Sequence, residues 1–460
     1  MSAGAHLGWL GIVRLGLVQT ALGAIVVLTT STLNRVMVVE LALPALLPGA
    51  LVALHHVLQM LRPRLGHGSD VGGRRTPWIV GGMAVLSLGG IAAALATAWM
   101  EVNLAAGIAL AVAAFVMIGL GVGAAGTTLL ALLAKQVAPE RRAAAATVVW
   151  VMMIVGFIVT AGLAGHFLDP FSSARLVAVA TAVSVSAFVL ALFAVRNVER
   201  SAAEMRSGTA RVAGQPEARA DFRGAILEVW AEPQARRFTI FVFVSMLAYS
   251  AQDLILEPFA GLVFGLTPGE STKLSGVQNG GVLAGMLLVG LCSSVIGGRR
   301  LGSLRAWTVG GCIASAAALA ALAVAGFVGP AWPLRPSVFL LGLANGAFAV
   351  AAIGSMMALA GAGRPGSEGI RMGLWGGAQA IAFAVGGLVG TGAVDLARAL
   401  LDTNVAAYAI VFIAEALVFL VAAQMAARVV GAPAPTATQP ATQVVPAAAP
   451  RALASAWARQ

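Results

Sequence analysis

Long apolar stretches alternate with short polar ones along most of the chain. A membrane-spanning helix needs about 20 predominantly apolar residues, and twelve stretches of the sequence come close to this length. The pattern therefore predicts an all-α polytopic membrane protein with twelve transmembrane helices. These helices are predicted at residues 15–37, 45–62, 78–99, 106–134, 143–166, 176–195, 238–262, 274–296, 306–328, 337–360, 372–394 and 404–427.

Composition and charge agree with this class. The chain is 59% hydrophobic and only 10% charged, whereas soluble domains carry about 25% charged residues. Its net charge of +11 raises the question of a nucleic-acid partner, but all except five of the 29 Lys and Arg residues fall on one side of the predicted membrane. Basic loops mark the cytoplasmic side. The excess charge thus predicts topology, with both termini in the cytoplasm, and no nucleic-acid partner.

Landmarks of the first half recur in the second. The sequence Gly-Gly-Arg-Arg occurs at residues 72–75 and again at 297–300, an offset of 225, and Arg142 recurs as Arg371 at an offset of 229. Landmarks at a near-constant offset indicate a duplicated six-helix unit. We therefore predict an N-terminal six-helix bundle at residues 1–196 and a C-terminal one at residues 237–428.

The polar segments outside the bundles have distinct compositions. The cytoplasmic linker, residues 197–236, ends in a stretch with Phe222, Leu227 and Trp230 among charges. This stretch is either an amphipathic helix on the inner membrane surface or a solvated, partly disordered linker. The tail, residues 429–460, is rich in Pro, Ala, Thr and Gln, and we expect it to be disordered in the cytoplasm.

The loop after the second predicted helix carries the spacing G-x-x-x-D-x-x-G-R-R. Glycines allow a tight reversal, an aspartate accepts hydrogen bonds from helix-start amides, and arginines hold the loop in the cytoplasm. The motif resembles the signature loop of the major facilitator superfamily, which implies the major facilitator fold. Its residues are Gly66, Asp70, Gly73, Arg74 and Arg75.

Polar residues within predicted spans are costly and are candidate functional sites. The first and seventh spans both end with an amide, a charged residue and then a glutamate. In the fold that the resemblance implies, these spans face each other, and Arg35 could pair with Asp253 or Glu257 to close the outer side. Alternatively, the charges lie at the interface and reach water. The candidate gate residues are Asn34, Arg35, Glu40, Gln252, Asp253 and Glu257.

Two adjacent histidines, His55 and His56, lie near the middle of the second predicted span. Neutral imidazole can ligate a metal or a magnesium tetrapyrrole. Neighbouring helical residues point about 100° apart, so at most one histidine faces a given ligand, and Gln59 lies one turn from His55. Hydrogen-bonded packing residues are the alternative interpretation.

Enzyme signatures are missing from the sequence. It contains no P-loop, no G-x-S-x-G, no H-E-x-x-H and no Cys-x-x-Cys. The two cysteines, Cys292 and Cys312, have no metal-ligand spacing. We therefore predict no catalytic residues, no enzymatic activity and no metal-ion site.

Three segments carry a closer resemblance. Residues 32–41, 61–70 and 74–78 resemble the PucC/LhaA group, the bacteriochlorophyll-delivery proteins of phototrophic bacteria. The chain is most similar to the branch encoded among pigment-synthesis genes. This resemblance implies a factor for bacteriochlorophyll delivery and for assembly of light-harvesting or reaction-centre complexes, located in the inner or intracytoplasmic membrane. Bacteriochlorophyll or a precursor would be bound cargo. Implied partners are membrane lipid, light-harvesting or reaction-centre subunits and pigment-synthesis enzymes.

Two other functions stay open at this point. A proton-coupled transporter of a small solute would use Glu40, Asp253 or Glu257 as its coupling carboxylate. A scaffold for pigment-synthesis enzymes would need no pigment site at all.

Overall fold

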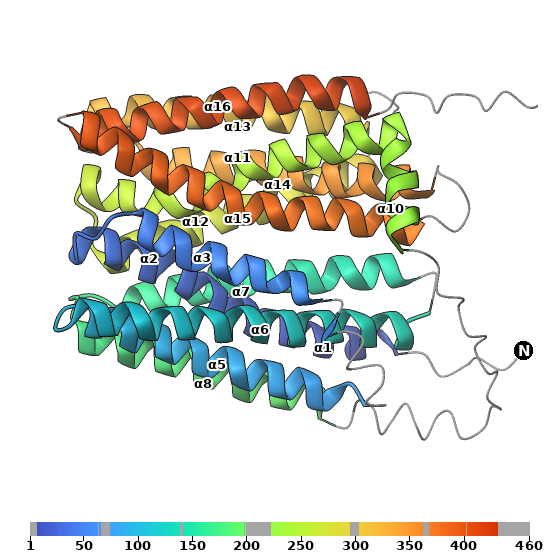
Figure 1. The fold of residues 1–460 in the computed structure, drawn as a ribbon, viewed down its shortest axis with the longest axis horizontal. Helices are drawn as coiled ribbons and strands as arrows, with labels where there is room; N and C mark the ends of the chain where they lie inside the picture. The colour runs from blue at the N-terminus through green and yellow to red at the C-terminus, as the bar shows by residue number, and fades with distance from the viewer. Residues whose placement is uncertain are drawn as a thin grey trace, which may run out of the picture.

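The structure is a computed structural model that describes residues 7–62, 64–65, 74–138, 141–196, 198, 222–294, 303–361, 368–401 and 403–430. Regular structure in these residues is helical. The long helices run along one axis of the molecule and form a bundle (Figure 1). Eleven of the described helices are long and apolar enough to cross a membrane.

The first half begins with a long, irregular helix. It consists of α1 (Trp9–Val27), a π-helical turn η1 (Leu28–Thr32), α2 (Leu33–Arg35) and a second π-helical turn η2 (Val36–Glu40). The helices that follow are α3 (Leu46–Leu58) with η3 (Gln59–Leu61), α5 (Thr76–Trp99), α6 (Leu104–Gln136), α7 (Arg142–Phe167) and α8 (Ser173–Val195).

The second half begins with a short helix. After α10 (Phe222–Ala231), the helices are α11 (Pro233–Phe264), α12 (Pro268–Ser294), α13 (Leu304–Val328) with η5 (Gly329–Ala331), α14 (Leu334–Gly361), α15 (Glu368–Leu400) and α16 (Asn404–Val429). Each of the twelve predicted spans therefore contains a helix. The second is the shortest, because its apolar helix covers only Leu46–Leu61.

Each half has its own apolar core. In the first half the core includes Phe115 and Leu176 and takes in Leu254 from the second half. In the second half the core includes Phe348 and Phe412. Lipid removes most of the hydrophobic drive between helices, so close packing of small residues holds such bundles together.

Glycines allow the closest helix contacts. A Cβ atom added at Gly342 would overlap the carbonyl of Gln278, and one added at Gly346 would overlap the carbonyl of Val282. Helices α12 and α14 therefore pack backbone against backbone, an approach that larger residues would prevent.

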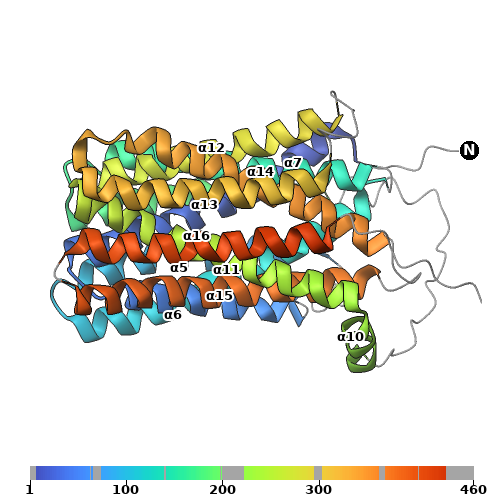
Figure 2. The same ribbon diagram turned by 90° about the horizontal axis from the view of Figure 1, so that it is seen from above.

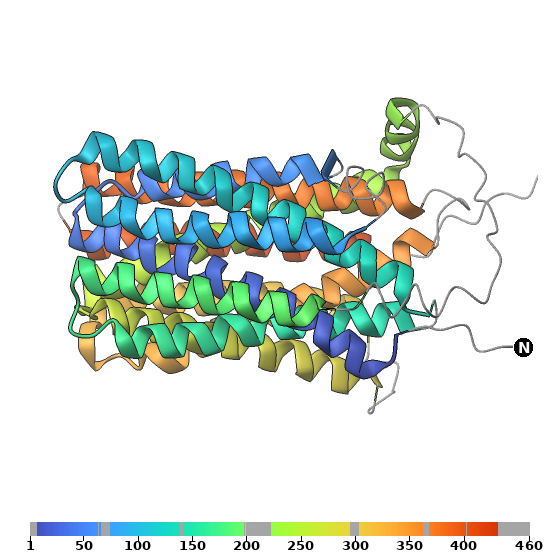
Figure 3. The same ribbon diagram turned by 90° about the horizontal axis from the view of Figure 1, so that it is seen from below.

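Both described chain ends lie at one end of the bundle (Figure 1). We call this the basic end, because Arg62, Arg75, Arg142 and Arg371 lie in or beside the loops there, and we call the opposite end the far end. Helix α10 also lies at the basic end, transverse to the spans (Figures 2 and 3). The helical alternative for the end of the linker is therefore the one that the structure contains.

Candidate functional site

The boundary between the two halves contains a cluster of buried polar residues. The π-helical turn η1 carries Ser31 and Thr32, and Asn34 and Arg35 follow directly in α2; each of these side chains is buried. Single π-helical turns within α-helices are frequent at functional sites. The irregular end of the first span therefore presents polar groups, and not only apolar ones, to the second half.

These residues bond to the second half across what we call the seam. The Asn34 side chain donates to the carbonyl of Leu254 at 2.6 Å, and Arg35 donates to the carbonyl of Leu266 at 2.6 Å. The remaining contacts join hydroxyl and carboxylate groups. The Thr32 and Thr272 hydroxyls are 3.0 Å apart, and the Ser31 hydroxyl contacts the Ser275 hydroxyl at 3.0 Å and the Glu257 carboxylate.

A proline explains why Leu254 can accept the Asn34 bond. Pro258 lies inside α11, and proline has no N–H to donate to the carbonyl four residues earlier, here that of Leu254. Prolines in membrane helices are tolerated where a neighbouring group satisfies the freed carbonyl. The Asn34 amide does this from the other half of the protein.

Arg35 forms an ion pair with Glu40 in its own helix, whereas no ion pair joins it to Asp253 or Glu257 in the described residues, and the role of these residues as an outer gate stays a prediction. The physical reason for the pairing with Glu40 is the π-helical turn η2, in which residues five apart align. The Arg35 side chain is only 2% exposed, whereas the Glu40 side chain is 33% exposed.

Near the end of α11, the counterpart of the first span in the repeat, the buried polar side chains have fewer hydrogen-bond partners than those of the first span. Glu257 is buried and bonded to Ser31, and Asp253 accepts from Gln278 at 3.4 Å. Gln252 is fully buried, and neither atom of its amide has a partner among the described residues. Glu415 of α16 is buried too, and neither of its carboxylate oxygens is bonded within the described part of the chain. The sequence reasoning missed Glu415, although a lone carboxylate in an apolar run was a usable signal.

Two further contacts join the halves at the far end. The Asp395 carboxylate of α15 accepts the N–H groups of Ala45 and Leu46, at 2.9 and 2.7 Å, at the start of α3. Asp169, just after α7, accepts the N–H of Gly269 in α12 at 3.2 Å. Each aspartate thus binds the positive end of a helix in the other half. We call them the α3–α15 clasp and the α7–α12 clasp.

The two clasps are related by the internal repeat. Asp169 and Asp395 are 226 residues apart, which falls among the offsets of the duplicated landmarks. Neither aspartate was singled out from the sequence. The repeat spacing was the signal that could have identified them, because a duplicated bundle places equivalent residues on opposite sides of a two-fold axis.

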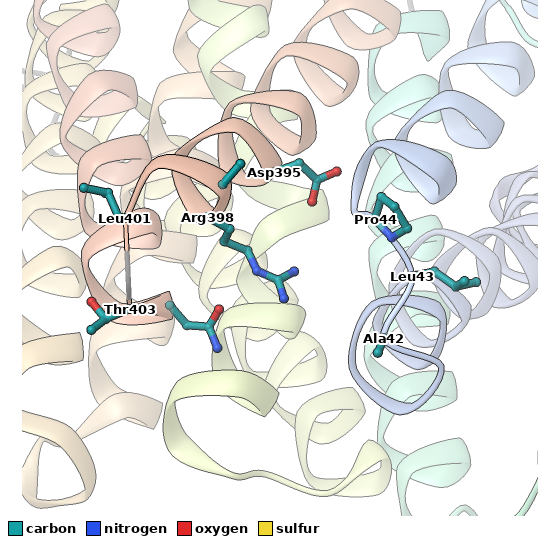
Figure 4. A pocket seen from close by; sticks show the side chains of 9 residues that line it. Ala42, Leu43, Pro44, Asp395, Arg398, Leu401 and Thr403 are labelled. Carbon is teal, nitrogen blue, oxygen red and sulfur yellow. The ribbon is translucent and has the colours of Figure 1, made fainter.

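A cavity of about 450 Å³ adjoins the α3–α15 clasp. Figure 4 shows it between the loop that precedes α3 and the ends of α15 and α16, with the Arg398 side chain reaching into it. Both halves therefore contribute to its walls. The residues that line it are Ala42, Leu43, Pro44, Asp395, Arg398, Ala399, Leu401, Thr403 and Asn404.

The histidine pair lies where α3 packs against α15, and its two members differ. His55 is 2% exposed, and its Nε2 is 2.9 Å from the Gln59 amide nitrogen. His56 is only partly buried, and its ring centroid is 5.4 Å from that of Phe383. The contact of His56 Nδ1 with Gln59 is long, at 3.4 Å, and no described residue bonds to its Nε2.

Part of the loop motif lies outside the described residues, namely Gly66, Asp70 and Gly73. Arg74 is exposed, and the Arg75 guanidinium donates to the carbonyl of Ala131 near the end of α6. A cation that bonds a helix-end carbonyl also complements the helix dipole. The role assigned to the motif as a whole stays a prediction.

Comparison with solved structures defines the class of protein. The chain is similar to the nucleoside transporter NupG, with a TM-score of 0.64 and 12% identity, covering 92% of this chain and 99% of that one. It is also similar to a POT family transporter in complex with a peptide, with a TM-score of 0.65 and 12% identity, covering 90% and 95%. At this identity the likeness shows the fold, which is the predicted fold of major facilitator transporters.

Comparison with sequences defines the family. A family model described as "PUCC protein" matches residues 32–434. The "Bacteriochlorophyll synthase 44.5 kDa chain" of Rhodobacter capsulatus is 56% identical over 426 residues, covering 93% of this chain and 96% of that protein. "Protein PucC" of the same species is 30% identical over 436 residues, covering 89% and 90%. The chain belongs to the PucC family, and the resemblance drawn from its motifs is confirmed.

Proposed function

We propose that this protein is a non-enzymatic membrane factor that holds bacteriochlorophyll, or a precursor of it, during assembly of light-harvesting or reaction-centre complexes. Its place would be the cytoplasmic or intracytoplasmic membrane of a phototrophic bacterium. Family membership and the names of its relatives support this role. The observation that carries it is an imidazole nitrogen, His56 Nε2, that no described residue occupies, between the two halves of a highly apolar protein.

The local geometry favours His56 over His55 as the magnesium ligand. The Nε2 of His55 contacts Gln59, and its Nδ1, which has no partner among the described residues, is buried with the rest of the side chain. A large ligand would therefore have to displace packed neighbours to reach His55. His56 is partly exposed and has an open Nε2. Ligation through Nε2 places the ring proton on Nδ1, where only the long contact with Gln59 is given up.

The surroundings of His56 match the chemistry of a chlorin pigment. Such a pigment is a flat apolar ring around one magnesium ion, and it needs apolar walls and few polar anchors. Phe383 lies next to the His56 ring, and Tyr249 lies next to Phe383 with ring centroids 5.9 Å apart. These aromatic groups come from α15 and α11, so a pigment held there would contact both halves.

Substitution of the proposed ligand tests the proposal. The full chain is purified in mild detergent, and near-infrared absorption gives the pigment-to-protein ratio. We expect His56→Leu to lower pigment occupancy about tenfold, because a ligand bond of about 1.4 kcal/mol changes binding by that factor. His166→Leu is the matched control, since His166 is exposed near the end of α7 and its loss should leave the ratio unchanged.

Unchanged pigment bands in a folded His56→Leu protein would overturn the assignment of the ligand. A wild-type protein that is colourless when isolated from pigmented membranes would overturn the proposed function. Co-purification of pigment-synthesis enzymes with such a colourless protein would favour a scaffold.

A proton-coupled transporter is the second candidate, because the second half holds buried carboxylates. Glu257 and Glu415 are both buried, and three of their four carboxylate oxygens have no partner among the described residues. Carboxylates in such positions mark proton relays in membrane proteins. Proton uptake linked to a solute, measured with a colourless protein in sealed vesicles, would favour this function over pigment delivery.

A further inference from the structure

The far-end cavity contains one positive charge, the Arg398 guanidinium, that no described residue pairs with. Arg398 is partly buried in the last turn of α15 and has no hydrogen bond or ion pair with any described residue. The other charged group in the cavity wall, the Asp395 carboxylate, already accepts two backbone N–H groups. An anion that enters the cavity would therefore find the Arg398 guanidinium available.

The two clasps, which the internal repeat relates, differ in the surroundings of their cations. At the α7–α12 clasp, Lys273 lies 4.0 Å from Asp169, so the cation there has a carboxylate partner. At the α3–α15 clasp, the aspartate is committed to α3 and the nearby arginine faces the cavity (Figure 4). Among the described residues, one cation thus lies beside the aspartate of its clasp, whereas Arg398 has no carboxylate partner.

Other groups around Arg398 suit an anion. Thr403 and Asn404 line the cavity at the start of α16. The Thr403 hydroxyl accepts the N–H of Ala406 at 3.3 Å, so its own proton is free to be donated. A helix start also favours negative charge, which adds to the attraction of the guanidinium.

The position of the cavity and the exposed leucines beside it on α15 indicate the source of the anion. Helix α15 is long enough to cross a membrane, so its end near Arg398 lies at the depth of lipid head groups. Leu396 and Leu400 are 62% and 74% exposed. They flank Ala399 of the cavity wall on the α15 surface. An apolar strip therefore runs from the cavity toward the membrane interior.

We propose that this cavity binds the phosphate group of an anionic membrane lipid, with Arg398 as its cation and the acyl chains along Leu396 and Leu400. Because the walls come from both halves, the bound lipid bridges them beside the α3–α15 clasp and stabilises the contact between the halves there. The proposal is independent of the pigment role.

Lipid-dependent thermal unfolding of the full chain in detergent tests the proposal. We expect phosphatidylglycerol to raise the unfolding midpoint of the wild type, and phosphatidylcholine to raise it much less. In Arg398→Gln the apparent affinity for phosphatidylglycerol should fall about tenfold, as expected for the loss of a charge-assisted hydrogen bond. Arg335→Gln is the matched control, because Arg335 is an exposed far-end arginine at the start of α14.

Further measurements distinguish lipid binding from binding of free phosphate and from the absence of a site. Inorganic phosphate at the same concentration should not raise the unfolding midpoint as phosphatidylglycerol does. An equal rise would refute the lipid as the ligand and indicate that the site binds free phosphate. Equal responses of Arg398→Gln and the wild type would overturn the site. If Arg398→Gln does not fold, native mass spectrometry of the wild type in mixed lipids decides, because one retained phosphatidylglycerol supports the proposal and no preference over phosphatidylcholine refutes it.

Discussion

The two clasps occupy equivalent positions in the internal repeat but differ in the number and length of their hydrogen bonds. At the α3–α15 contact, Asp395 accepts two N–H groups at 2.9 and 2.7 Å. At the α7–α12 contact, Asp169 accepts one at 3.2 Å and has a distant cation, Lys273, at 4.0 Å. Duplication therefore placed an acidic cap at the same position twice, and the two copies then diverged in what surrounds it.

The difference shows how a duplicated membrane fold can separate two tasks. The α7–α12 clasp neutralises its own charge. At the α3–α15 clasp, Arg398 instead lies beside a cavity without a partner in the described part of the chain, and on the same pair of helices His56 packs against Phe383. Both proposed ligands, the pigment and the lipid, thus lie along the α3–α15 contact. No ligand is proposed at the α7–α12 contact, so it serves as the internal comparison for the effect of helix packing without a ligand.

Removing the aspartates of the two clasps should have the largest effect on the free energy of unfolding. Equal losses for the two substitutions would contradict the difference between the clasps. We expect Asp395→Ala to lower the free energy of unfolding by about 2 kcal/mol, because two charge-assisted hydrogen bonds are lost. Asp169→Ala should cost about 1 kcal/mol, the usual value of a single helix cap. Unfolding in mixed detergent micelles measures both. A larger loss for Asp169→Ala would contradict the order of the clasps.

The seam between the clasps should give an intermediate effect. Asn34→Leu removes the bond to Leu254 and should cost about 1 kcal/mol, as for hydrogen bonds between membrane helices. Pro258→Ala restores the N–H that the Leu254 carbonyl lacks. In that background Asn34→Leu should therefore cost less, and a double-mutant cycle measures the difference. Full additivity of the two substitutions would refute the explanation of the Asn34 bond.

The ion pair at the α7–α12 clasp should give the smallest effect. Lys273 and Asp169 are 39% and 30% exposed, and exposed ion pairs contribute about 0.2–1 kcal/mol. Lys273→Gln should thus lower stability by less than about 0.5 kcal/mol, and high salt should remove the difference from the wild type. A loss as large as that of Asp395→Ala would show that the ion pair, and not the helix cap, holds this clasp.

The features that could be predicted from the sequence are those that depend only on the residues of one helix. A span needs an apolar stretch of sufficient length, so the helix positions follow from hydropathy. The buried polar pattern of Asn34 and Arg35 was visible because polar residues are rare in such stretches. The partner of Arg35 could not be predicted, because a π-helical turn aligns Glu40 with it. No local sequence pattern predicts that turn.

The amino-acid sequence by itself determined that the chain crosses a membrane about a dozen times, that it repeats a six-helix unit, and that it resembles the PucC family. These properties depend on residue types and their spacing along the chain. Only the tertiary structure decided that Asn34 completes the backbone at Pro258, that His56 Nε2 is open while His55 Nε2 contacts Gln59, and that Arg398 has no partner among the described residues. Such facts depend on which helices meet, because a polar group inside a membrane is satisfied or left open by neighbours that lie hundreds of residues away in sequence.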